Sequence, residues 1–324
     1  MALKCVTNYN ELMKRSWVSL LLCVIGLTAC GTVTPAIPAT PSPAPTILPT
    51  ITTATSTPIP SPTLTPTLTI APLNLHPQVI VLATNLPGPD DLLLAPDNSI
   101  YISDVDDGTI KQYTRDGQVH VVVSGLDEPE GMVVLPDGSL VIAEQGRNRL
   151  VRYDFKSGTY APLLNFENNT KDSGVDGIGW DGSSLIIPDS PNGRILSVSP
   201  DGKTVSQLAS GFSRPTDAWV ESDGNILITD ENANALIRLH ADGTREKLAD
   251  LSIPDDVVED AAGNIFVVTL GDGAIHAILA GTNQDVVLVG GLGYDNPQGI
   301  VFDSDGNLIV TDQGHHRLLK VLIR

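Results

Sequence analysis

Residues 297–312 read PQGIVFDSDGNLIVTD, in which two short apolar runs flank a DSDGN turn and an aspartate ends the second run. A turn of this kind, where a positive φ costs little, predicts a β-hairpin when apolar runs flank it. The pattern occurs six times, and the other copies are PDDLLLAPDNSIYISD from Pro89, PEGMVVLPDGSLVIAE from Pro129, VDGIGWDGSSLIIPD from Val175, PTDAWVESDGNILITD from Pro215 and PDDVVEDAAGNIFVVT from Pro254. A period of about 40 residues is typical of four-stranded propeller blades.

Strands outside the six copies predict how the ring closes. Two more apolar runs follow the first copy, TIKQYT at 109–114 and QVHVVVSG at 118–125, but the sixth copy ends at Arg324 after only three strands. A strand without a partner copy, PQVIVLATN at 77–85, precedes the first copy. We therefore predict an all-β, six-bladed propeller with four-stranded blades over residues 76–324, closed by the N-terminal strand pairing in the last blade.

The wording of the copies is similar to that of a known family. The stretch PQGIVFDSDGNLIVTDQGHHRLLKV at 297–321 resembles an NHL repeat, and all six copies resemble NHL and gluconolactonase-like (senescence marker protein-like) six-bladed propellers. The resemblance implies the fold, but this architecture hosts binding scaffolds, hydrolases and lyases alike. The resemblance also implies that a sequence such as QGHHR is usual in these repeats, so we interpret His315 and His316 as structural.

The N-terminal segment predicts export and anchoring. Lys14 and Arg15 precede a short apolar run at 16–28, which is typical of a signal peptide. LTAC at 27–30 resembles the lipobox of bacterial lipoproteins, which implies cleavage before Cys30 and a lipid on its sulfur. We expect residues 1–29 to be a lipoprotein signal peptide and residues 30–75 to be the lipidated cysteine with a Thr/Pro-rich disordered linker. The protein would then be held at the outer face of a bacterial membrane; the alternative is an ordinary signal peptide with an incidental cysteine.

The excess of acidic over basic residues limits the classes of partner that the protein is expected to bind. Loss of the signal peptide would remove Lys4, Lys14, Arg15 and Glu11 from the 19 basic and 38 acidic residues, changing the formal charge from −19 to −21. Nucleic acid is therefore an unfavourable partner, and cations are favourable ones. We expect a protein, peptide or small-molecule ligand, with the membrane reached through the lipid anchor.

The second residue of each copy, which follows a proline in five copies and Val175 in the third, is acidic in four copies, and we call this position the entrance slot. The occupants are Asp90, Glu130, Asp176, Thr216, Asp255 and Gln298. The next slot is glycine in three copies and Asp91, Asp217 or Asp256 in the others. Six-fold arrangement should bring all these side chains to one end of the central channel. Crowded carboxylates favour a hard cation with oxygen ligands, and Ca²⁺ is the natural one outside the cytoplasm.

The candidate metal ligands rest on two kinds of argument. The resemblance implies a divalent metal at the channel mouth on a glutamate, an asparagine and aspartates, and Glu130 in PEGM and Asp176 in VDGI match positions of that kind. Asp91, Asp217 and Asp256 are candidates from the ring arrangement alone. No asparagine occupies an entrance slot, which departs from the family pattern. The alternative is that these acids accept hydrogen bonds from backbone amides of neighbouring loops or face water.

Two function classes remain open. In the first, the propeller is an extracytoplasmic binding module with Ca²⁺ at its channel mouth. In the second, it is a metal-dependent hydrolase of lactones or esters, with the ion at Glu130, Asp176 and neighbouring aspartates. The sequence lacks GxSxG, HExxH, P-loop and CxxC motifs, so we assign no catalytic residue and expect no organic cofactor.

Overall fold

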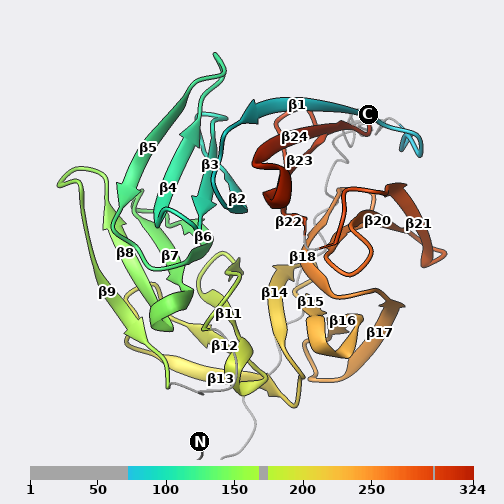
Figure 1. Ribbon diagram of the computed structural model, residues 1–324. Helices are drawn as coiled ribbons and strands as arrows, with labels where there is room; N and C mark the ends of the chain where they lie inside the picture. Colours follow the sequence, from blue (N-terminus) through green and yellow to red (C-terminus); the bar gives the residue numbers. More distant parts are fainter. Residues whose placement is uncertain (1–71, 168–173, 295) are drawn as a thin grey trace, which may run out of the picture. The chain divides into compact units, whose positions relative to one another are not determined.

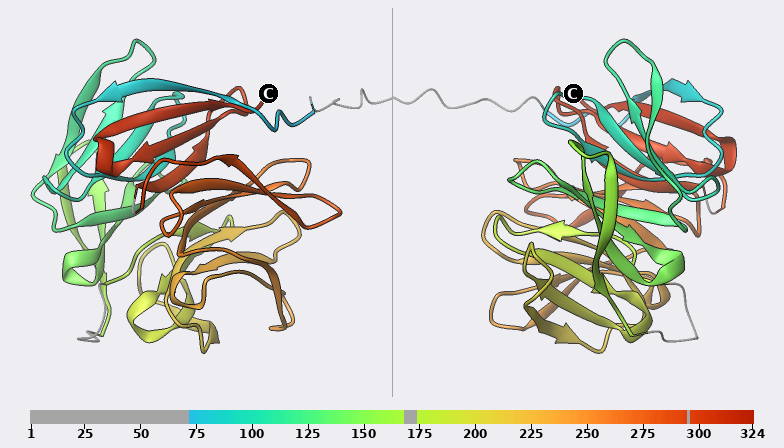
Figure 2. Two further views of the ribbon diagram at one scale, coloured as in Figure 1. Left: turned by 45° about the vertical axis from the view of Figure 1, so that its right-hand side comes forward. Right: turned by 90° about the vertical axis from the view of Figure 1, so that its left-hand side faces the viewer.

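The computed structural model describes residues 72–167, 174–294 and 296–324, and these residues form six four-stranded antiparallel sheets arranged as a ring. Figure 1 shows the innermost strands around a common axis, and Figure 2 shows the same sheets from two sides. The predicted six-bladed propeller is therefore confirmed. The predicted signal peptide and most of the linker lie outside the described residues. Within the described ranges, no helix is long and apolar enough to cross a membrane.

The blades follow one another along the chain. The first contains β2 Pro89–Leu94, β3 Ile100–Asp104, β4 Thr109–Tyr113 and β5 Val119–Ser124, and the second contains β6 Pro129–Val134, β7 Leu140–Glu144, β8 Arg149–Asp154 and β9 Thr159–Asn165. The third contains β10 Gly179–Trp180, β11 Leu185–Asp189, β12 Arg194–Val198 and β13 Val205–Ser210. The fourth contains β14 Pro215–Val220, β15 Ile226–Asp230, β16 Ala235–Leu239 and β17 Arg245–Asp250.

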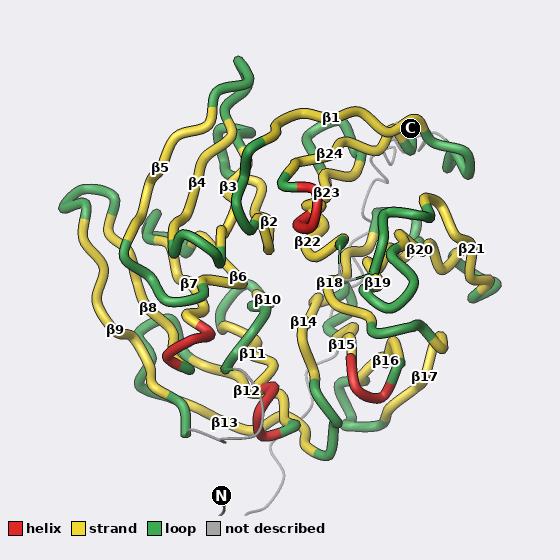
Figure 3. Tube along the Cα trace, viewed as in Figure 1, coloured by secondary structure: helices red, strands yellow, loops and turns green. Residues whose placement is uncertain are grey.

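The last two blades complete the ring. The fifth contains β18 Pro254–Glu259, β19 Ile265–Thr269, β20 Ala274–Leu279 and β21 Gln284–Val289, and the sixth contains β22 Pro297–Phe302, β23 Leu308–Asp312, β24 Arg317–Leu322 and β1 Gln78–Thr84. Single-turn 3₁₀ helices follow the second strand of four blades, as Figure 3 shows: η1 Gln145–Arg147, η2 Ser190–Asn192, η3 Glu231–Ala233 and η4 Gln313–His315.

The turn between the first two strands of every blade has the predicted backbone. One residue in each turn has a positive φ, and these residues are Asn98, Gly138, Gly182, Gly224, Gly263 and Gly306. An aspartate in the same turn accepts a main-chain hydrogen bond, as from Ser99 N to Asp97 Oδ1 at 3.0 Å. Glycine and asparagine tolerate the left-handed region of backbone conformation. The residues that predicted turns in the sequence therefore lie at the turns of the observed hairpins.

The core lies between the sheets. In each blade the second strand is buried along its whole length, from β3 in the first blade to β23 in the sixth. Such strands are covered on both faces, which explains why their residues are apolar at successive positions and do not alternate. Phe266 of the fifth blade and Phe302 of the sixth meet edge to face, with their ring centroids 5.6 Å apart. Side chains of adjacent blades therefore interlock around the ring.

The two ends of the described chain lie in one sheet. β1 pairs antiparallel with β24, from Gln78 opposite Leu322 to Thr84 opposite Arg317. Asn74 N also donates to Ile323 O at 3.0 Å. The predicted closure of the ring by the early strand is confirmed.

Deletion of the chain through Thr84 should lower the melting temperature by more than about 10 °C, because it removes the closing strand and uncovers the edge of β24. Deletion through residue 71 leaves β1 intact and is the matched control. Thermal unfolding followed by circular dichroism would compare the two proteins. Coinciding melts would show that closure contributes little to stability.

A shift in strand pairing at the start of the innermost strands positions the candidate functional site described below. In β2 the pairing with β3 shifts register between Pro89 and Leu92, so that three steps on β2 match two steps on β3. The same shift occurs in β6, β14, β18 and β22. A bulge of this kind releases residues from regular pairing. The released positions are the entrance slot and the slot after it.

Candidate functional site

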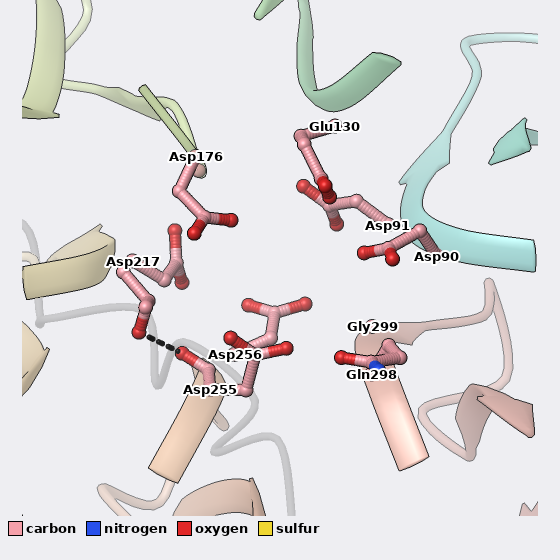
Figure 4. Close-up of a pocket in the computed structure, with 11 residues that line it drawn as sticks. Asp90, Asp91, Glu130, Asp176, Asp217, Asp255, Asp256, Gln298 and Gly299 are labelled. Atoms are coloured by element: carbon pink, nitrogen blue, oxygen red, sulfur yellow. Dashed lines mark hydrogen bonds between the residues drawn. The ribbon is translucent and has the colours of Figure 1, made fainter. Parts of the chain in front are cut away.

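The entrance slots of all six blades meet at one end of the channel. They line a cavity together with the slot that follows, and the lining residues are Asp90, Asp91, Glu130, Asp176, Gly177, Thr216, Asp217, Asp255, Asp256, Gln298 and Gly299. Figure 4 shows their labelled side chains arranged around one space. The structure thus brings together all five candidate metal ligands, Glu130, Asp176, Asp91, Asp217 and Asp256. We call the six entrance-slot residues the mouth ring, and Asp91, Asp217 and Asp256 the inner aspartates.

The cavity is small. Its volume is about 10 Å³, which is room for about one water molecule or one bare ion. Seven carboxyl groups border this space. A whole sugar ring does not fit among them, so an organic ligand would contact the ring from the solvent side.

Burial and mutual repulsion disturb the ionisation of the mouth ring. Burial, followed by the nearby Asp90 and Asp176, raises the pKa of Glu130 well above its ordinary value. Burial, followed by the same two aspartates, also raises the pKa of Asp255 well above its ordinary value. Because each ionised carboxylate destabilises the next one, the ring holds protons that separated carboxylates would release.

Arg214 partly offsets this repulsion. Its Nη2 lies 3.2 Å from Asp176 Oδ2, and the guanidinium also contacts the Glu231 carboxylate. Burial nevertheless raises the pKa of Asp176 to about 7, against the lowering effect of Arg214 and with help from Asp90 and Asp217. Asp176 is therefore a carboxyl group poised to exchange a proton near neutral pH.

Arg214 is not among the site residues predicted from the sequence, although the sequence contains a clue to it. The position two residues before the entrance slot is occupied by Gly88, Glu128, Gly174, Arg214, Ile253 and Asn296 in the six copies, and arginine is the only basic residue among them. Its side chain reaches the mouth because the Asp230 carboxylate holds the loop, accepting hydrogen bonds from Ser213 N at 2.9 Å and from Arg214 N at 2.8 Å.

Two glutamines form the amide part of the mouth. Gln298 Nε2 donates to Gln313 Oε1 at 3.2 Å, and Gln313 Nε2 donates to Asp90 Oδ2 at 2.8 Å. Figure 4 shows the oxygen of the Gln298 amide directed toward the common space. Gln298 occupies an entrance slot and supplies an amide oxygen there, although it is not among the metal ligands predicted from the sequence.

The inner aspartates also link neighbouring blades. Asp217 Oδ2 accepts a hydrogen bond from Val257 N of the next blade at 3.3 Å, and Asp256 Oδ2 accepts one from Ile300 N at 2.7 Å. Asp91 Oδ1 accepts from the adjacent Leu92 N at 2.6 Å. The alternative considered for these acids, hydrogen bonding to backbone amides, is therefore present in the structure. Burial, then repulsion from Asp217 and Asp91, raises the pKa of Asp256 well above its ordinary value.

Glycine fills the same slot where the blades approach most closely. Gly177 N donates to Thr216 O at 2.8 Å, and a Cβ added to Gly177 would lie 2.4 Å from Asp217 Oδ1. A Cβ on Gly299 would lie 2.5 Å from Asp90 O. The presence of glycine in three blades and of aspartate in the other three thus reflects two ways of joining adjacent inner strands.

The carboxylates that end the second strand of most blades are structural. They are buried, and four of the five form ion pairs within their own blade, as Asp312 does with Arg317 Nε at 2.6 Å and Asp189 with Arg194 Nε at 2.5 Å. Asp104 also accepts a hydrogen bond from Gly88 N at 3.0 Å, which is the amide-capping role expected of a repeated acid. His315 Nδ1 lies 2.8 Å from Asp312 Oδ1 and His316 Nδ1 lies 2.6 Å from Pro87 O, so both histidines hold this loop.

The donor chemistry of the mouth suits a hard divalent cation. Carboxylate and amide oxygens are the ligands that Ca²⁺ takes, usually six to eight of them in flexible geometry. Among the described residues, no three acidic, histidine or cysteine side chains already stand in a metal-binding group. Binding an ion would therefore draw the carboxyl groups inward from their mutually repelled positions.

Comparisons with known proteins agree with this fold. An NHL repeat model matches residues 294–321. No curated protein matches the chain in sequence. A putative gluconolactonase of known structure is 21% identical with a TM-score of 0.62, covering 76% of this chain and 93% of that one.

Two further structures extend the range of neighbours. The gluconolactonase of Xanthomonas campestris is 16% identical with a TM-score of 0.66, covering 76% of this chain and 90% of that one. Virginiamycin B lyase from Staphylococcus aureus is 14% identical with a TM-score of 0.59, covering 77% and 99%. At these identities the likeness carries the fold and not the activity. The chain is a six-bladed β-propeller with an NHL repeat in its last blade, and its fold is that of gluconolactonase-like and virginiamycin B lyase propellers.

Proposed function

We propose that the channel mouth binds one divalent cation, Ca²⁺, and that the propeller is a ligand- or protein-binding module displayed outside the cell on a lipid anchor. The observation that carries this proposal is the set of seven carboxyl groups around a cavity with room for one ion. Burial and mutual repulsion raise the pKa values of Glu130, Asp255 and Asp256, and Arg214 offsets the repulsion only in part. A bound Ca²⁺ would supply further positive charge and fix the loops that surround the mouth.

The mouth ring includes Glu130, Asp176 and Asp255. Glu130 is the most deeply buried of these three residues. We place the ion among the mouth ring, with the Gln298 amide oxygen as a further ligand and the inner aspartates beneath it. Arg214 stands on one side of this ring, where it is available to an anionic group of a partner or ligand that approaches the ion.

Calorimetric titration of Ca²⁺ into chelator-treated protein tests the ion site. We expect saturable binding with proton release, because Ca²⁺ displaces protons from carboxyl groups whose pKa is raised. The released protons are counted by repeating the titration in buffers of different ionisation enthalpy. Glu130→Gln should weaken binding by about tenfold or more.

The control for that titration is Asp116→Asn, which changes a fully exposed carboxylate in the turn between β4 and β5. Its affinity should equal that of the unmodified protein. Absence of saturable heat with Ca²⁺, or equal losses in both variants, would reject the ion site.

The anchor is proposed from residues 27–30, which lie outside the described part of the chain. Expression in a bacterium that carries the lipoprotein pathway should yield a protein that incorporates radiolabelled palmitate and sediments with membranes. Cys30→Ser should abolish both, whereas Cys23→Ser, in the apolar run, should change neither. Membrane association that persists in Cys30→Ser would exclude lipidation at this residue.

A second candidate function is the hydrolysis of lactones or esters, and Asp176 is the observation that favours it. Its pKa is about 7 without a metal, and a bound cation would lower this pKa and favour the ionised form, which can accept a proton from water at neutral pH; Arg214 lies beside it, 3.2 Å from Asp176 Oδ2. A divalent ion bound at the mouth would polarise the substrate carbonyl. Gluconolactonases share the fold, which makes glucono-δ-lactone the first substrate to test.

Lactone turnover would be followed by the acid that hydrolysis releases, with Ca²⁺ present. We expect Asp176→Asn to lower kcat by about 10²-fold or more while the protein stays folded, since a general base contributes that much. Tight Ca²⁺ binding without turnover would leave the binding module as the function.

A further inference from the structure

A second cavity lies directly behind the inner aspartates. Its volume is about 330 Å³, and its walls come from the innermost strands of all six blades, β2, β6, β10, β14, β18 and β22. It shares Asp91, Asp217 and Asp256 with the mouth cavity, so these three residues separate the two spaces. A volume of this size is within the range of small-molecule sites.

The walls of this second cavity, which we call the channel cavity, are apolar. They include Leu93, Met132, Ile178, Val258 and Val301, and the two indole side chains of Trp180 and Trp219. None of the described residues that line the channel cavity is a lysine, arginine or histidine. Partly exposed side chains such as Trp180 and Trp219 thus form an apolar surface inside the protein that is available to a ligand.

The one polar end of the channel cavity is held rigidly. Asp256 accepts main-chain hydrogen bonds at both oxygens, from Val257 N at 2.7 Å and from Ile300 N at 2.7 Å. Asp217 accepts from Val257 N at 3.3 Å. Each carboxylate oxygen has two lone pairs, so these bonds orient the groups and leave acceptor capacity at the end of the cavity.

The arrangement is complementary to one kind of molecule. Three acidic groups at one end require a cationic head, and the apolar walls require a tail without charge. An ammonium group offers three donors in a compact charge, which suits a cluster of acceptors. A bare metal ion would leave the apolar walls unused, and an anion would be repelled.

We propose that the channel cavity binds a small primary alkylamine, with its ammonium group at the inner aspartates and its alkyl tail against Trp180 and Trp219. This site goes beyond the proposed calcium site, from which the inner aspartates divide it. The two cations would lie close together, so each should weaken the binding of the other.

Intrinsic fluorescence is the direct test, because the chain has three tryptophans and two of them line the channel cavity. The full chain carrying Trp17→Phe leaves Trp180 and Trp219 as the only indoles. n-Hexylamine should change their emission saturably in calcium-free buffer. Hexan-1-ol, which has the same tail, should bind about tenfold or more weakly, since it has one donor and no positive charge where the ammonium group has three donors and a charge. Hexanoate should give no saturable change.

Two sets of variants assign the site. Asp217→Asn with Asp256→Asn removes two of the three carboxylate charges, with the loss of one main-chain acceptor at position 256, and should bring the affinities for n-hexylamine and hexan-1-ol within about threefold of each other. Ile178→Phe should fill part of the cavity and abolish the response, and Val121→Phe on the outer strand β5, where the side chain is 59% exposed, is its matched control. Val301→Phe repeats the filling from another blade.

Equal binding of the amine and the alcohol to the unmodified cavity, no saturable change, or a response that survives both filling variants would overturn the proposal. Calorimetry with Ca²⁺ on the same samples keeps the two sites distinct. Amine binding without Ca²⁺ binding would reject the calcium site alone. Ca²⁺ binding without an amine response would reject the channel site alone.

Discussion

Metal-free protein should lose stability as the pH rises from about 4 to about 8, with Asp176 making a large contribution. Its pKa is 3.8 in a model peptide and about 7 in the folded protein. The folded state therefore keeps a proton that the unfolded chain releases, so stability is complete below about pH 4 and is lost as the pH rises toward 7. At about 1.4 kcal/mol per pKa unit, this shift corresponds to on the order of 4 kcal/mol.

Urea unfolding at a series of pH values in the presence of chelator measures this effect. Asp176→Asn should flatten the pH profile over that range and should make the protein more stable at pH 8. Asp201→Asn is the matched control, because the Ser199 hydroxyl and Lys203 lower the pKa of Asp201 to about 2, below the window of the experiment. A profile that is flat in the unmodified protein, or equally steep in Asp176→Asn, would contradict the prediction.

Calcium should reverse the instability of the mouth at neutral pH. At a free Ca²⁺ concentration of about 100 times Kd, binding to the folded state alone stabilises it by about 2.7 kcal/mol. For a domain of this size each kcal/mol raises the melting temperature by about 2–4 °C, so we expect a rise of roughly 5–11 °C. The rise should be smaller with Mg²⁺, which requires stricter octahedral geometry.

Scanning calorimetry with and without chelator measures the calcium effect. Glu130→Gln should remove about half of the rise or more at the same Ca²⁺ concentration, because it takes away a buried carboxylate of the mouth ring and weakens binding about tenfold or more. Asp116→Asn should keep all of it. A rise of the same size in Glu130→Gln would place the ion elsewhere on this acidic protein.

The repeated sequence pattern was sufficient to predict the fold, because each repeat contains the residues that its turn requires. Asn98 and Gly138 occupy the left-handed turn positions of the first two blades. The carboxylates of Asp104 and Glu144 accept main-chain hydrogen bonds that hold the adjoining loops of the same two blades. Because each blade must cover its neighbour, six copies of the same local sequence pattern are compatible with one arrangement, a ring of six blades. The closing strand followed from counting strands in the last repeat.

The site could be located from sequence but not fully interpreted. Entrance slots converge in any six-fold ring, so the position of Glu130 and Asp176 was predictable. The hydrogen bonds of Asp217 and Asp256 to the next blade were not, because they depend on the spacing between sheets. Arg214 was also missed, because a single arginine outside the repeated slots gives no periodic pattern.

The channel cavity was the least predictable feature. Trp180 and Trp219 both contact core clusters, so their positions in the sequence are equally compatible with packing between blades. Their inner faces border the channel cavity only because the six innermost strands stand far enough apart to leave a space. That distance is set by the number of blades and not by any single residue.

Closure by β1 also has a mechanical consequence. The strand that completes the last sheet is the one that connects the propeller to all of the preceding chain. Any tension along that preceding segment would enter the ring at its closing pair, where Gln78 lies opposite Leu322. A tethered propeller built in this way would respond to pulling first at the sixth blade, so the same hydrogen bonds that shut the ring would set the force at which it opens.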